Sequence, residues 1–79
     1  MARYFFHLCD GQDILLDPDG RELDGASLIA ALALKEARSI ISHDALTGSI
    51  RLDQSIEVRD ETDEVVHRLS FRDAITING

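Results

Sequence analysis

One stretch of this 79-residue chain, residues 24–47, repeats its apolar side chains with the period of an α-helix. The repeats come at three- and four-residue spacings and place one stripe of residues on a single side: Ala26, Ala30, Ala33, Leu34, Ala37, Ile40 and Ile41. Asp24 is predicted to cap the first turn, and Gly48 is predicted to end the helix in a left-handed conformation. The sequence therefore predicts one long amphipathic helix, which needs a second apolar surface to pack on.

Short segments on both sides of this helix have the composition of β-strands. The predicted strands are residues 3–8, 14–16 and 21–23 before the helix, then 50–52, 55–59 and 64–71 after it. Turn sequences separate them: Cys9-Asp10-Gly11, Asp17-Pro18-Asp19-Gly20 and Asp60-Glu61-Thr62-Asp63. We predict an α+β fold over residues 1–79 as a single domain: a small, mostly antiparallel sheet in the order β-β-(β)-α-β-β, with the helix on one face.

The last two predicted strands form a hairpin whose loop length decides which face of the second strand is buried. A two- or four-residue loop places Val65, His67 and Leu69 on the face of Ile56 and Val58, whereas a three-residue loop with a bulge places Val66 there. We favour the first arrangement because it brings opposite charges of the two strands face to face. In this arrangement, Glu57 and Arg59 of the first strand face Glu64 and Arg68 of the second.

The charge of the chain excludes several classes of partner. Fifteen acidic residues against eight basic ones give a net charge of −7, with a pI near 4.6. An average field of this sign repels phosphate groups, so we predict no nucleic-acid partner and no binding to an anionic membrane. Cys9 is the only cysteine, so we predict no disulfide and a cytoplasmic location. No apolar run approaches the roughly twenty residues of a membrane span.

Few residues carry the side chains that catalysis or metal binding needs. His7 and Cys9 alternate along a predicted strand and so point the same way, but zinc takes about four ligands, and only His67 or His43 is left to add. Ser42-His43-Asp44 contains the three residue types of a catalytic triad. Consecutive side chains diverge by about 100° around a helix, however, so these three cannot hydrogen-bond to one another as a triad does. We predict no catalytic residue, no metal and no cofactor.

Two leucines of the predicted helix lie outside its apolar stripe. Leu28 and Leu32 fall roughly opposite Ala37, one turn apart, in a row with Lys35 and Ser39. A helix that packs only on one core has no need of two leucines there. The row Leu28, Leu32, Lys35 and Ser39 is therefore the candidate interface, although a single exposed leucine is also common on ordinary surfaces.

Several short segments together carry a family resemblance. They are Arg3-Tyr4-Phe5-Phe6-His7, Asp10-Gly11, the turn that ends at Gly20, residues 33–37, Ile56-Glu57-Val58 and Leu69-Ser70-Phe71-Arg72-Asp73-Ala74. With them the chain resembles a family of short bacterial proteins of unknown function that begin with R-Y-F-F-H. The resemblance implies a small cytoplasmic domain with no assigned activity. His67 and Asp63 depart from the expected pattern, which puts only the hairpin in question.

These observations predict a non-enzymatic interaction or regulatory domain that self-associates as a homodimer or binds a protein partner. A small chain with a thin core gains most from burying surface against a partner. The alternative is a small enzyme or metal-dependent sensor around His7, Cys9 and His67. An enzyme gathers its polar groups in one pocket, whereas here they are spread over turns and outer faces.

Overall fold

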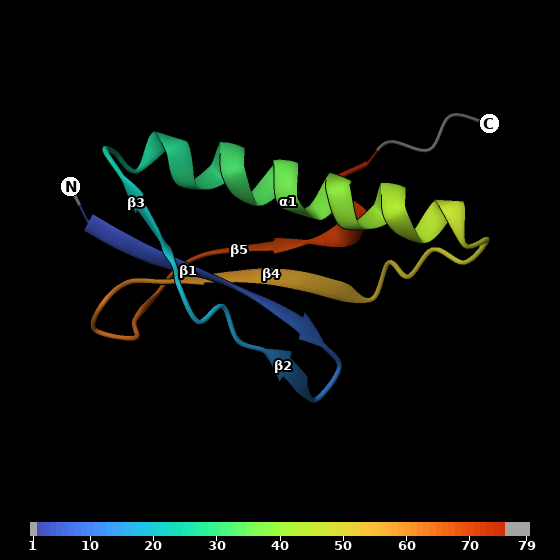
Figure 1. The fold of residues 1–79 in the computed structure, drawn as a ribbon, viewed down its shortest axis with the longest axis horizontal. Helices are drawn as coiled ribbons and strands as arrows, with labels where there is room; N and C mark the ends of the chain where they lie inside the picture. The colour runs from blue at the N-terminus through green and yellow to red at the C-terminus, as the bar shows by residue number, and fades with distance from the viewer. Residues whose placement is uncertain (1, 76–79) are drawn as a thin grey trace.

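A computed structural model describes residues 2–75 of the chain. Its elements are β1 (Ala2–Asp10), β2 (Asp13–Leu15), β3 (Arg21–Leu23), α1 (Ser27–Leu46), β4 (Gln54–Arg59), β5 (Val65–Ser70) and the 3₁₀ turn η1 (Phe71–Asp73). All strand pairs are antiparallel, and α1 crosses one face of the sheet (Figure 1). The predicted α+β fold with one helix on one face is confirmed. The single domain was predicted over 1–79, of which residues 1 and 76–79 lie outside the described range.

The sheet is built around β1. Its strand order is β2-β1-β4-β5, and β3 also pairs with β1. β2 and β3 follow one another along the same edge of β1: Leu8 pairs with Leu15, and Tyr4 pairs with Arg21. Between these two pairs, the loop 16–20 is two residues longer than the segment of β1 that lies opposite it. The edge strand is therefore split into β2 and β3 (Figure 1).

The β4–β5 hairpin takes the favoured arrangement at His67 and Leu69, but not at Val65, which pairs with Arg59 and is 43% exposed. Val58 pairs with His67 and Ile56 pairs with Leu69, so these four side chains share one face, which is the face under the helix. A register shift between Val58 and Arg59 adds a bulge near the turn. The hairpin therefore combines the buried face of the first alternative with the bulge of the second. Residues 50–52, predicted as a weak strand, form no strand, because the chain there runs as a loop up to Gln54.

The core lies between α1 and the β4–β5 side of the sheet. The buried residues of α1 are Ile29, Ala33, Ala37 and Ile41, and they pack with Ile56, Val58 and Phe71. Small alanines at the centre let the helix axis come close to the sheet. The predicted stripe is correct in its second half, but Ala26 and Ala30 are exposed, and Ile29 takes the buried position instead.

Only the C-terminal end of α1 matches the prediction. Ala26 is the N-cap and makes no side-chain cap hydrogen bond, so the prediction that Asp24 caps the helix was wrong. Gly48 has φ of +87° and donates its N–H to the Ala45 carbonyl at 3.1 Å, which confirms the predicted left-handed end. No helix within residues 2–75 is long and apolar enough to cross a membrane.

Ala37→Leu should lower the free energy of unfolding by about 1 to 3 kcal/mol, because Ala37 is 0% exposed and added methylenes force the core apart. Urea denaturation followed by circular dichroism measures the change. Ala31→Leu is the matched control, since Ala31 is an exposed position of the same helix and should change stability by less than about 0.5 kcal/mol. Equal midpoints for Ala37→Leu and wild type would contradict the assigned core.

Candidate functional site

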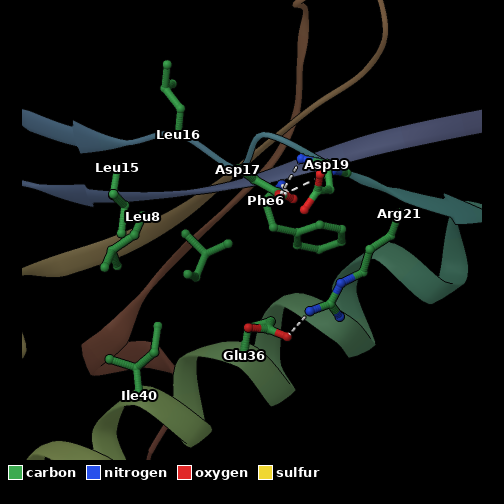
Figure 2. A pocket seen from close by; sticks show the side chains of 11 residues that line it. Phe6, Leu8, Leu15, Leu16, Asp17, Asp19, Arg21, Glu36 and Ile40 are labelled. Carbon is green, nitrogen blue, oxygen red and sulfur yellow. Dashed lines mark hydrogen bonds and ion pairs between the residues drawn. The ribbon is translucent and has the colours of Figure 1, made fainter.

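The structure leaves half of the helix-facing side of the sheet without a helix over it. α1 packs mainly on β4, β5 and η1, so β1 and β2 stay open beside it. A cavity of about 420 Å³ lies there (Figure 2). Its apolar wall consists of Phe6, Leu8, Leu15, Leu16, Ile40 and Ile56. We call this cavity the helix-side groove. Leu15 and Leu16 are 69% and 64% exposed, so its outer wall is open to solvent.

Charged groups close one end of the helix-side groove. Arg21 and Glu36 form an ion pair across it, from β3 to α1 (Figure 2). The Arg21 guanidinium also lies 5.5 Å from the centroid of the Phe6 ring, within the range of a cation–π contact. Asp17 and Asp19 add two carboxylates at the same rim. The groove is therefore apolar along its length and mainly acidic at this end.

Asp17 holds the split edge strand together. Phe6 lies in the gap between β2 and β3, and its N–H donates to the Asp17 carboxylate at 3.2 Å. The other oxygen of the same carboxylate accepts from the N–H groups of Asp19, at 3.3 Å, and Gly20, at 3.2 Å. Partial burial raises the pKa of Asp17, but these backbone donors and nearby Arg21 outweigh it, and the pKa lies below its usual value.

Gly20 permits this loop to lie close to β1. Its φ is +69°, and a Cβ there would lie 2.8 Å from a ring carbon of Phe5. Any other residue at position 20 would have both the strained backbone and the clash. The turn Asp17-Pro18-Asp19-Gly20 is therefore fixed by its own sequence, and its carboxylate is placed where β1 lacks a strand partner.

The opposite, outer face of the sheet carries a buried carboxylate. Glu57 is 5% exposed, and its side chain accepts hydrogen bonds from Arg68 and Arg59, both at 2.6 Å. These two arginines hold the pKa of Glu57 below its usual value, against the effect of burial. The predicted Glu57–Arg68 pair is confirmed, whereas Arg59 pairs with Asp63, at 3.1 Å, as well as with Glu57.

A second cavity, of about 370 Å³, lies on this outer face; we call it the outer-face cavity. Its floor is formed by Phe5, His7, Leu16 and Pro18. The rings of Phe5 and His7 stack with their centroids 6.3 Å apart and their planes 16° from parallel. Asp17 also lines it, and three further acidic residues, Asp60, Glu61 and Asp63, lie around it.

The structure separates the residues of the metal-sensor alternative. His7 and Cys9 lie on the outer face with Glu57, whereas His67 is paired with Val58 on the helix-facing side. The His7 Nδ1 accepts a hydrogen bond from the Asp17 N–H at 3.0 Å, so this nitrogen is engaged within the fold. Residues 2–75 hold no group of three or more His, Cys, Asp or Glu side chains placed to bind a metal. The constellation of His7, Cys9 and His67 therefore does not form.

The candidate interface row lies on the outer side of α1. Leu28 is 44% exposed, and Lys35 and Ser39 are exposed as expected. Leu32 is half-buried and packs against the core, so the expectation that it faces water was wrong. Leu32 precedes Glu36 and Ile40 at four-residue spacing, which places it on the ridge of α1 that borders the helix-side groove. Whether this row is an interface stays a prediction.

Comparison with known proteins places the chain in a family without assigning it an activity. No curated protein and no solved structure matches it significantly. The family model of a domain of unknown function, DUF6894, matches residues 3–72. That range runs from the second residue of β1 through most of η1 and so includes every strand and the helix. The chain therefore belongs to the DUF6894 family, as its resemblance to a family of unknown function predicted.

Proposed function

We propose that this domain is a non-enzymatic interaction module of the cytoplasm that self-associates through the helix-side groove. The observation that carries the proposal is the apolar half-face of the sheet that α1 leaves open. Its wall includes Leu15 and Leu16, which are more than half exposed. Contiguous exposed apolar surface with a polar rim is typical of interaction sites.

The size of the open half-face matches a second helix. A helix with its side chains is about 10 to 12 Å wide, whereas neighbouring strands lie about 4.8 Å apart, so one helix covers about two strands. The sheet is four strands wide in the order β2-β1-β4-β5, and α1 packs on β4 and β5. One helix width therefore remains over β1 and β2.

The helix of a second copy has suitable side chains for this place. Leu28 and Leu46 are exposed, at 44% and 85%, and each lies nine residues from Ala37, so both fall on the side of α1 opposite its buried face. A two-fold axis that runs parallel to α1 would lay Leu28 and Leu46 of each helix over β1 and β2 of the other copy. Lys35 lies between them and would meet the acidic rim of the partner's groove.

This arrangement makes a sandwich in which two parallel helices lie side by side between two sheets. Each helix would contact its own sheet through the Ala33–Ala37 side and the other sheet through the Leu28 side. Such packing would explain why the predicted interface row is apolar at its first end and cationic at its centre. The same geometry supports a binding role over catalysis, since Arg21 and Glu36 at the groove are already paired with each other.

Leu28→Glu should convert the dimer to a monomer, because it places a charge where the partner's sheet would exclude water. Sedimentation velocity of wild type and variant at matched concentrations measures this. Leu28 is the better site than Leu32, whose half-buried side chain also supports the core. Ile50→Glu is the matched control: Ile50 is 49% exposed in the loop after α1, and its variant should remain dimeric. A monomeric wild type would overturn the proposal.

A further inference from the structure

We infer that the outer-face cavity binds an arginine side chain of a partner protein segment, with the guanidinium between the Phe5–His7 floor and the carboxylate rim. The cavity lies on the face of the sheet opposite the helix-side groove, since Phe5 and His7 alternate with Phe6 and Leu8 along β1. The two cavities share Leu16 and Asp17 in their linings, but this inference rests on the outer-face cavity alone and does not depend on self-association.

The floor of the cavity suits a flat cation. Phe5 and His7 present stacked rings, with Leu16 and Pro18 beside them. A guanidinium is planar and weakly hydrated, so it stacks on aromatic faces more readily than a lysine ammonium does. The apolar floor excludes water from one side of the bound group, which strengthens its attraction to the nearby carboxylates.

The rim of the cavity has negative charge in excess. Asp63 pairs with Arg59, but Asp60 and Glu61 form no ion pair within residues 2–75. Asp60 uses one oxygen to hold the hairpin turn, bonding the N–H groups of Thr62 and Glu64. Glu61 uses one oxygen to accept the Arg3 N–H, at 3.0 Å. Each of these two carboxylates therefore keeps a second oxygen for a cationic ligand.

His7 supplies a donor that favours a polypeptide over a free cation. The side chain is only 7% exposed, and because its Nδ1 accepts from Asp17, the neutral ring carries its proton on Nε2. This Nε2–H has no hydrogen-bond partner within residues 2–75, although His7 lines the cavity. This nitrogen is not enclosed by the protein, so a backbone carbonyl of the bound segment would take the place of a water molecule there.

The test uses the peptide acetyl-Gly-Arg-Gly-amide as probe, followed by ¹⁵N–¹H chemical shifts of the domain. The peptide should shift the amides of β1 and of the loops 16–20 and 60–63. The same peptide with citrulline, which keeps the shape of arginine without its charge, should not. Guanidinium chloride should bind more weakly than the peptide. Equal binding of citrulline peptide, or of guanidinium alone, would overturn the inference, as would shifts confined to the helix-side groove.

Two charge-matched variants separate the site from the general field of an acidic protein. Glu61→Gln should weaken peptide binding by about three- to fivefold, while the amide keeps an oxygen for the Arg3 N–H. Glu64→Gln changes the net charge equally but lies outside the cavity lining, and it should leave binding unchanged. Equal losses in both variants would show that only net charge attracts the peptide. Leu28→Glu should bind the peptide as wild type does.

Discussion

Phe71→Ala should be the most damaging single substitution in this domain, lowering the free energy of unfolding by about 3 to 5 kcal/mol. Phe71 is 0% exposed and is the largest fully buried side chain of the core. It starts η1 directly after β5 and sits where η1 meets both α1 and β4. Its removal leaves a cavity that three elements border, and none of them can close it without breaking its other contacts.

The loss is large compared with the stability available to a chain of this size, roughly 4 to 12 kcal/mol at the usual stability per residue. Urea denaturation at low temperature, followed by circular dichroism, gives the midpoint and the slope. Phe71→Leu keeps most of the volume and should cost less than Phe71→Ala, which provides a graded comparison. A Phe71→Ala midpoint equal to that of wild type would show that η1 does not belong to the core.

Glu57→Gln should lower the free energy of unfolding by about 1.5 to 3 kcal/mol at neutral pH, the usual contribution of hydrogen bonds to a charged group. The buried carboxylate accepts from Arg68 and Arg59, and an amide satisfies neither guanidinium as well. Its pKa in the folded state lies below the ordinary value of 4.5, and the unfolded chain has no such partners.

This difference fixes the direction of the pH dependence. A carboxyl with a lowered folded pKa adds stability that is fully present above about pH 4.5 and is lost as the pH falls through the folded value. Denaturation midpoints between pH 7 and pH 3 should therefore fall less steeply for Glu57→Gln than for wild type. Asp17 and Asp60, whose pKa values are also lowered, should contribute to the dependence that remains.

Glu22→Gln is the control for this experiment. Glu22 pairs with Arg3 at 2.9 Å, but its side chain is 52% exposed, so the pair should contribute less than about 1 kcal/mol. Its pH dependence should match that of wild type. If Glu57→Gln and Glu22→Gln gave the same small change, burial of Glu57 would have no energetic consequence.

The elements that local sequence determines were predicted well. The helix, its end at Gly48 and the third strand follow from periodicity and turn residues, because these act over a few neighbouring positions. The cap of the helix was placed two residues early, since the chain first completes the pairing of Leu23 with Ala2, a contact that local sequence does not reveal. The absence of a strand at residues 50–52 also depends on distant contacts.

The surfaces beside the helix were harder to predict. A helical wheel centred on Ala37 treats the buried stripe as parallel to the helix axis. The buried residues of α1 are four positions apart, however, and each such step rotates the side-chain direction by about 40° around the axis. Towards the N-terminal end this drift exposes Ala30 and brings Leu32 against the core. The helix-side groove depends on the strand order, which no single segment encodes, so no sequence signal predicted it.

The central position of β1 also determines the order in which this chain can fold. β1 pairs with β4, about fifty residues later in the chain. During synthesis the edge of β1 that pairs with β4 therefore stays unpaired until the whole helix has been made. The other edge of β1 can pair early, because β2 and β3 follow it directly in the chain and each pairs with part of that edge. The aromatic first strand is thus shielded early on one side by a local hairpin. The slow step should be the closing of β1 onto β4, a contact of long sequence separation that brings the two halves of the chain together.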